Sequence, residues 1–123
     1  MTEEFDATKP IYMQIMEKVN KKIVRNEWKS GDKLPSVREM AVQTGVNPNT
    51  IQRTYSELER MGIVETRRGQ GTFVTENEEV IKRLREQLKQ EIMSDFVRNM
   101  KELGFTIDEI VASLKDFSQG EGV

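Results

Sequence analysis

Amide and guanidinium side chains gather in one short stretch of the sequence, NPNTIQR at residues 47–53. Asparagine and glutamine can each form paired hydrogen bonds with adenine, and arginine can do so with guanine. On a helix, such side chains are typical of a reader of the major groove of DNA. On an isolated helix, the same side chains would indicate only a solvated polar face. The neighbouring segments of the chain therefore decide between these two interpretations. The candidate DNA-binding residues here are Asn47, Asn49, Thr50, Gln52 and Arg53.

A second basic group follows at a glycine-rich turn, RRGQG at residues 67–71. Glycine permits positive φ and a close backbone approach, while arginine provides charge for phosphates or for a narrow minor groove. We reject a nucleotide-binding loop because no Lys-Ser or Lys-Thr follows and the region has no βαβ pattern. DNA contacts are therefore expected from Arg67, Arg68, Gly69, Gln70 and Gly71.

The residues that the chain lacks argue against catalysis. Histidine and cysteine are both absent, which removes the commonest general base, the commonest metal ligand and all thiolate chemistry. The sequence thus predicts no enzyme, no metal site and no cofactor. No apolar run approaches the roughly 18 residues that a membrane span needs, and the N-terminus lacks a signal-peptide pattern. We expect a cytoplasmic protein without a membrane partner.

Two helix starts and a tight turn are expected to position the polar stretch. Ser36 and Glu39 have the spacing of a capping box, and Asn47 followed by Pro48 is typical of a second N-terminus. Gly45 stands between the two helices, where the chain must change direction. Helices joined so tightly cross steeply, as in a helix-turn-helix. The second helix, residues 48–61, is expected to bury Ile51, Tyr55, Leu58 and Met61.

The surrounding elements complete a winged helix-turn-helix domain at residues 1–75. A first amphipathic helix is expected at 10–26, after a loose polar arm at residues 1–8. The connector that follows contains Trp28, for which core packing is favoured over a ligand role, and Lys33-Leu34 as a short strand. Strands at 63–67 and 72–74 then form a β-hairpin. The expected fold class is mainly α with a small β-hairpin.

Residues 76–123 predict a two-helix region that makes a dimer. A long helix reaches about residue 103, and a capping box at Thr106 and Glu109 opens a last helix to about 117, before a frayed tail. Two antiparallel helices bury only one side of each, so a second copy of the chain is the expected partner. Packing back onto the winged domain is the alternative. The expected dimerisation residues are Ile81, Leu84, Leu88, Ile92, Phe96, Met100, Ile110, Leu114 and Phe117.

The charge is unevenly distributed. The net charge is −2, but residues 1–75 hold 12 Lys and Arg against 10 Asp and Glu, whereas residues 76–123 hold 7 against 11. Phosphate contacts dominate DNA affinity, so we expect few of them in each subunit. The acidic pI of about 5.4 supports the alternative function, a helical dimeric protein-interaction module without specific DNA binding.

Three segments resemble the DNA-binding domain of GntR-family bacterial transcription regulators: KPIYMQIMEKV, GDKLPSVREMA and GVNPNTIQRTYSELERMGIVETRRGQGTFV, covering residues 9–75. The short C-terminal region is similar to the YtrA subfamily, which dimerises through two helices. This resemblance implies a homodimeric repressor on an inverted-repeat operator, often beside ABC transporter genes. Such symmetry places the two half-sites about 34 Å apart, or a multiple of that.

The resemblance also assigns residues by position. Arg38 matches the DNA-contacting arginine that follows Leu-Pro-Ser in the family, and 47–53 match the start of the recognition helix. Many members have Ser/Thr-Arg where this chain has Asn47-Pro48. The contact made by that arginine is therefore missing, and Arg53 is expected to replace part of it. Larger branches of the family carry a sensor domain that this chain lacks, so any small-molecule effector is unknown.

Overall fold

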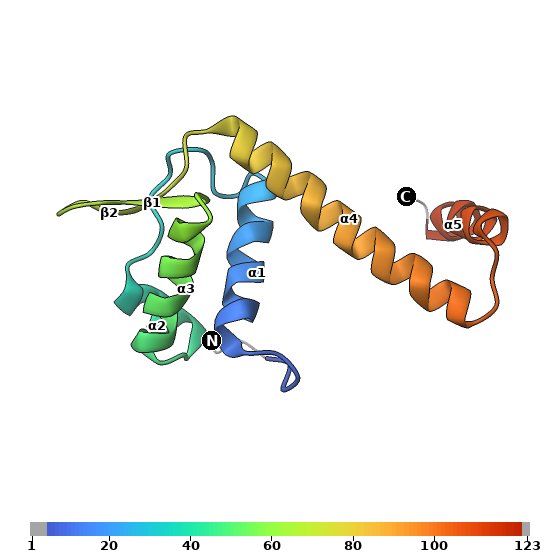
Figure 1. Ribbon diagram of the computed structural model, residues 1–123, viewed down its shortest axis with the longest axis horizontal. Helices are drawn as coiled ribbons and strands as arrows, with labels where there is room; N and C mark the ends of the chain where they lie inside the picture. Colours follow the sequence, from blue (N-terminus) through green and yellow to red (C-terminus); the bar gives the residue numbers. More distant parts are fainter. Residues whose placement is uncertain (1–4, 122–123) are drawn as a thin grey trace. The chain divides into compact units, whose positions relative to one another are not determined.

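A computed structural model describes residues 5–121, which form five helices and one two-stranded antiparallel sheet (Figure 1). The chain divides into two compact units that meet between Arg85 and Glu86. The elements, in order, are α1 (Ile11–Val24), α2 (Val37–Thr44), α3 (Pro48–Arg60), β1 (Val64–Arg67), β2 (Gly71–Val74), α4 (Glu78–Glu102) and α5 (Ile107–Glu121).

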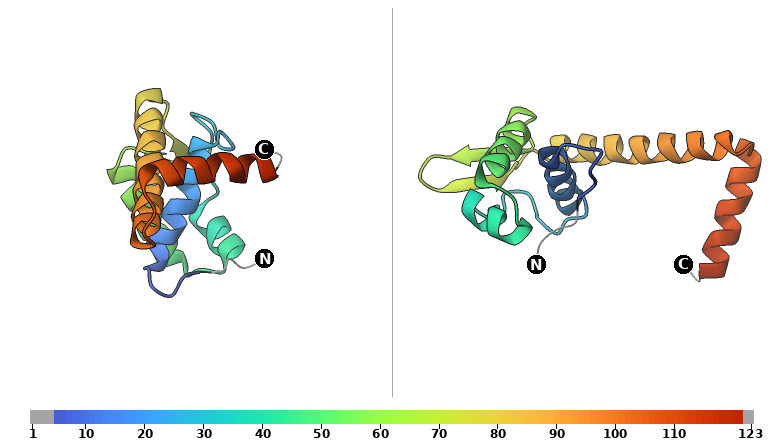
Figure 2. Two further views of the ribbon diagram at one scale, coloured as in Figure 1. Left: turned by 90° about the vertical axis from the view of Figure 1, so that its right-hand side faces the viewer. Right: turned by 90° about the horizontal axis from the view of Figure 1, so that it is seen from below.

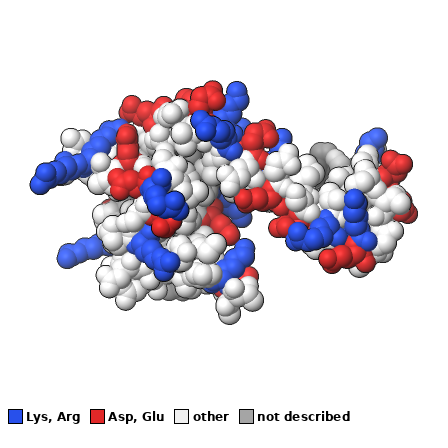
Figure 3. All heavy atoms as spheres, in the orientation of Figure 1, with Lys and Arg blue, Asp and Glu red and all other residues white. Residues whose placement is uncertain are grey.

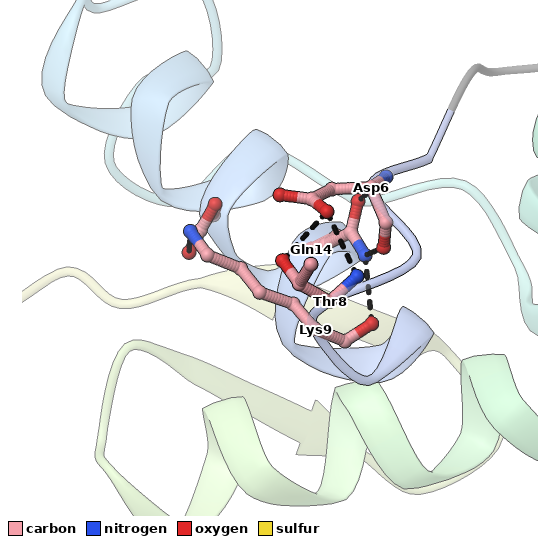
Figure 4. A network of polar contacts seen from close by, with 5 residues as sticks. Asp6, Thr8, Lys9 and Gln14 are labelled. Carbon is pink, nitrogen blue, oxygen red and sulfur yellow. Dashed lines mark hydrogen bonds and ion pairs between the residues drawn. The ribbon is translucent and has the colours of Figure 1, made fainter.

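The chain before α1 is tied to that helix rather than loose. The Gln14 side-chain oxygen accepts a hydrogen bond from the Asp6 backbone N–H at 2.7 Å, and its amide nitrogen donates to the Asp6 and Lys9 carbonyls at 2.6 and 2.9 Å (Figure 4). Asp6 in turn accepts bonds from the Thr8 backbone and hydroxyl. These bonds satisfy a buried amide. The expected loose arm is therefore wrong for residues 5–8, and residues 1–4 lie outside the described part.

The helix-turn-helix forms as its local signals predict. The Ser36 hydroxyl accepts the Glu39 N–H at 3.1 Å, and the Glu39 carboxylate accepts the Ser36 N–H at 2.8 Å, which confirms the capping box. Gly45 ends α2 at φ +69°, a left-handed conformation that costs glycine least. Asn47 caps α3 by accepting the Asn49 N–H at 2.8 Å, and Pro48 is the first helical residue.

The core of the first unit lies where α3 packs against α1 and α2. Ile15 and Val19 of α1 and Ile51 and Leu58 of α3 are almost completely removed from solvent. The expectation that Met61 is buried is wrong, since its side chain is 42% exposed. Met61 is the C-cap of α3, so it lies past the last turn that faces the core.

Leu58→Ala is expected to lower the free energy of unfolding by about 2–5 kcal/mol, because it leaves a cavity in the closed core. Leu58 is fully buried. Urea denaturation of both proteins at one concentration measures the change. Val42→Ala is the control, because Val42 is 80% exposed and surface substitutions change stability by no more than about 0.5 kcal/mol. Equal losses in the two variants would contradict this assignment of the core.

A third extended segment supports the β-hairpin. Strands β1 and β2 pair in antiparallel register from Val64 opposite Val74 to Arg67 opposite Gly71. The segment before α2 pairs with β2: the Leu34 N–H donates to the Thr72 carbonyl at 2.8 Å, and Lys33 forms a bridge with Phe73. Lys33 forms only an isolated bridge, so the short strand expected at residues 33–34 is not formed. This pairing anchors the hairpin to the helical core through backbone hydrogen bonds.

The second unit contains the later part of α4 and all of α5. Gly104 follows α4, and a capping box at Thr106 and Glu109, with bonds of 2.9 and 3.2 Å, begins α5. The expected antiparallel packing is wrong: α5 turns away from α4 rather than running back along it (Figure 2). The expected frayed tail is also wrong up to Glu121, which is still helical.

Candidate nucleic-acid interface

The first turns of α3 present a polar surface. The side chains of Asn49 and Gln52 are exposed, and Thr50 is half-buried. The Asn47 side-chain oxygen is used in capping, which leaves its amide N–H groups to donate to another partner. Gln52 bonds weakly to Ser56 at 3.4 Å. These amides remain available for the paired hydrogen bonds that recognise a base edge.

Arg53 is oriented by a residue that the sequence reasoning did not select. Its guanidinium carbon lies 3.8 Å from the centre of the Tyr12 ring in α1. A cation over an aromatic face is attracted by the ring's quadrupole. The Thr54 hydroxyl donates mainly to the Thr50 carbonyl at 2.9 Å and lies 3.4 Å from the Tyr12 backbone carbonyl, so α1 and α3 also approach each other closely here. The sequence pattern only indicated Tyr12 as part of an apolar stripe.

Arg38 lies in the first turn of α2 with its side chain exposed. The cap beside it is electrostatically stabilised, because backbone and side-chain hydrogen bonds from Ser36 lower the pKa of Glu39. A carboxyl with a lowered folded-state pKa stabilises the fold above its unfolded pKa. This stabilisation is lost as the pH falls through the folded pKa. At neutral pH the cap therefore holds the turn that carries Arg38.

The tip of the hairpin presents an exposed arginine, a glycine and a glutamine. Arg68, Gly69 and Gln70 are all exposed. Basic side chains project on the left of the molecule in Figure 3, the side where Figure 1 draws the β1–β2 hairpin. Gly71 has φ +121°, and a Cβ there would lie 2.8 Å from the Lys33 side chain. Lys33 is therefore a further basic residue at the hairpin, which the sequence reasoning missed.

Arg67 differs from Arg68 because it has partners inside the chain. It forms ion pairs with Glu65 at 3.0 Å and Glu76 at 3.2 Å, and its guanidinium carbon lies 4.1 Å from the centre of the Phe73 ring. The hydrogen bond to Glu65 is the main cause that raises the pKa of Arg67. These contacts connect both strands to the segment before α4. Arg67, the last residue of β1, is therefore held by contacts within the chain.

The residues expected at a dimer interface fall into three classes of burial. Leu84 and Ile110 are buried within the chain, at 6% and 3% exposure. Ile92, Leu114 and Phe117 are exposed, and Ile92 and Phe117 keep 63% and 64% of their surface. The remaining residues, Ile81, Leu88, Phe96 and Met100, are half-buried. The exposed and half-buried residues leave apolar side chains accessible on both α4 and α5.

Within residues 5–121, no group of three or more acidic, histidine or cysteine side chains could hold a metal ion. In the same part of the chain, no helix is both long and apolar enough to cross a membrane. The lack of a cofactor stays a prediction from the sequence.

Known proteins with similar sequences are transcriptional regulators. Residues 11–74 match the family described as bacterial regulatory proteins, gntR family. The HTH-type transcriptional regulator YhcF of Bacillus subtilis is 56% identical over 120 residues, which cover 98% of this chain and 99% of YhcF. The HTH-type transcriptional repressor YtrA of the same species is 41% identical over 117 residues, covering 89% of this chain and 90% of YtrA.

Solved structures share both the fold and the sequence pattern. A GntR family transcriptional regulator from Listeria monocytogenes superposes with a TM-score of 0.86 at 41% identity, over 91% of this chain and 98% of that protein. The AraR DNA-binding domain in complex with operator ORX1 has a TM-score of 0.54 at 26% identity, over 61% of this chain and 92% of that domain. The chain described here therefore belongs to the GntR family and is a DNA-binding transcriptional regulator of the YtrA type with a winged helix-turn-helix.

Proposed function

We propose that the protein is a homodimeric repressor that binds an inverted-repeat operator. The observation that carries this proposal is the set of accessible apolar side chains on α4 and α5. Large exposed apolar side chains such as Ile92 and Phe117 mark an interaction surface on a soluble protein. A second copy of the chain supplies the same surface, and a two-fold dimer presents two reading helices to a two-fold symmetric site.

Each subunit is proposed to read one half-site with α3 inserted in the major groove. Asn49, Gln52 and Arg53 are placed to contact base edges. Arg38 and Arg68 supply charge for the phosphate backbone at either side of α3. The operator complex of the AraR domain, which shares this fold, supports DNA as the partner. Asn47, Thr50, Gly69, Gln70 and Gly71 complete the proposed DNA-binding set, while Arg67 supports the hairpin.

The proposed regulatory role follows the family. The relative YtrA is named a repressor, and the resemblance to its subfamily implies control of transporter genes. A protein that binds operators acts where the chromosome lies, so the proposal places it in the cytoplasm. Repression requires only that the bound dimer blocks access to the promoter, and no catalytic residue is needed.

Selection of bound sites from random duplex DNA, with mass determination of the complex, tests the proposal. We expect enrichment of one inverted repeat, held by two chains. The enriched sequence can then be searched for upstream of transporter genes. Binding must also weaken steeply with salt, because phosphate contacts release counterions. A folded dimer that enriches no sequence would overturn the proposal and favour the protein-interaction module.

Tyr12→Leu is expected to weaken operator binding by about two- to fivefold, because an exposed cation–π contact is worth about 0.5–1 kcal/mol. Leucine keeps the apolar packing but leaves the Arg53 guanidinium without its ring. Tyr12→Phe is the matched control, since it retains the ring and should bind within error of the parent. Mobility shifts at a fixed salt concentration measure both. Equal losses in the two variants would show that the ring does not orient Arg53.

A further inference from the structure

A cleft lies on the first unit between α1, α2 and the connector that follows α1. Its volume is about 260 Å³. Ile15 and Val19 form part of its base, and both are closed off from bulk solvent. Met40 and Gln43 line the side made by α2. None of the residues expected to read bases in α3 lines this cleft, so the DNA-binding site does not account for it.

The charged lining of the cleft is entirely positive. Four basic residues line it: Lys18, Lys21 and Lys22 of α1 and Arg25, the residue that follows this helix. No Asp or Glu stands among the described residues that line the cleft. Arg25 pairs with Glu27, and Glu17, which precedes Lys18 in the sequence, pairs with Lys9. The chain as a whole has a net charge of −2. The four basic side chains around the cleft therefore have the opposite sign to the net charge of the chain, and they favour an anionic ligand.

The apolar lining includes the only tryptophan of the chain. Trp28 is half-buried and lines the cleft, rather than closing into the core as the sequence suggested. The Lys22 ammonium lies 5.3 Å from the centre of the Trp28 ring. Together with Met40, the ring gives one side of the cleft an apolar surface. The flat apolar part of a ligand can pack against this surface. A negatively charged group at the other end of the ligand then contacts the lysines.

We propose that this cleft binds a small organic anion with a ring or a short apolar body and a phosphate or carboxylate head. The size supports a small ligand, since sites for drug-sized molecules occupy roughly 300–1,000 Å³ and this cleft has about 260 Å³. The head lies between Lys21 and Arg25, and the body packs against Trp28. The site uses none of the residues proposed to contact DNA.

Phenyl phosphate is a suitable probe, because it joins one ring to one phosphate. Trp28 reports binding directly through its fluorescence, since no other tryptophan contributes. We expect a saturable change in emission with phenyl phosphate. Phenol and inorganic phosphate, which each carry half of the proposed pattern, should bind at least about tenfold more weakly, a difference of 1.4 kcal/mol. Inorganic phosphate that binds as tightly as the probe would overturn the role of the apolar wall.

Two variants with the same net charge distinguish binding at the cleft from a general effect of charge on the ligand. The double variant Lys21→Gln, Arg25→Gln should raise the Kd for phenyl phosphate about tenfold or more, because it removes both cations that are proposed to hold the anionic head. The control double variant Lys29→Gln, Lys82→Gln removes the same charge from residues that do not line the cleft. Its Kd should equal that of the parent. Equal Kd values in both double variants, with unchanged thermal unfolding, or a signal that never saturates, would overturn the proposal.

Discussion

Aspartate in place of Leu114 is expected to separate the two chains and to lower operator affinity by at least about 100-fold, the usual gain from linking two binding sites. Leu114 is 48% exposed in the single chain and lies on the apolar face of α5. In a dimer, this substitution would bury an unpaired carboxylate, which is strongly unfavourable. Analytical ultracentrifugation measures the association, and mobility shifts on the selected operator measure the affinity.

Ala112→Asp is the matched control for this experiment. Ala112 is also exposed, but it lies between Asp108 and Asp116 on the polar side of α5, so the same new charge stays in solvent. We expect this variant to remain a dimer and to bind the operator like the parent. If Leu114→Asp also remained dimeric at low concentration, the interface would have to lie elsewhere than on α5. If it became monomeric with unchanged operator affinity, dimerisation would not contribute to DNA binding.

Arg53→Ala is expected to weaken operator binding by about 10- to 100-fold and to relax selectivity at one base pair in each half-site, because a bidentate base contact is worth about 1–3 kcal/mol. The side chain is exposed and already held over the Tyr12 ring, so little ordering is needed on binding. Arg53→Lys should recover little of the loss, since lysine cannot make the paired contact. Mobility shifts against the operator and against single-base variants measure both effects.

Arg60→Ala provides the control on the same helix. Arg60 stands in the last turn of α3 and bonds to Glu57 at 2.8 Å, far along the helix from its reading end. Its loss removes the same charge from α3 but should leave selectivity unchanged. Thermal unfolding of all the variants should stay close to that of the parent. An Arg53→Ala protein that keeps both affinity and base selectivity would exclude this residue from base recognition.

The two reading elements could be predicted because their signals are local. Capping at Ser36 and Asn47 satisfies backbone N–H groups within a few residues. Gly45 needs a backbone conformation that side chains disfavour, so its position marks the turn. The β-hairpin likewise follows from two short strands around one glycine-rich turn. In each case, the residues that decide the conformation are neighbours in the sequence.

The roles of the arginines could not be separated in the sequence. Arg67 and Arg68 are adjacent and chemically identical, yet Arg67 pairs with Glu76 while Arg68 is exposed. Arg67 ends β1, where side chains point to alternate faces of the hairpin, whereas Arg68 begins the turn. Which face meets Glu76 depends on how the chain folds back after β2. The support of Arg53 by Tyr12 is equally non-local, since it depends on the crossing of α1 and α3.

The sequence by itself determined the winged helix-turn-helix, the polar start of α3 and the apolar stripes of α4 and α5, because periodicity and caps act over one or two turns. Features that depend on contacts between residues far apart in the sequence were decided only by the tertiary structure. It placed Trp28 on an open cleft, and it turned α5 away from α4. Removing an apolar side chain from water lowers the free energy whichever surface covers it. The pattern of apolar residues therefore predicts burial or association, but it cannot identify the covering surface.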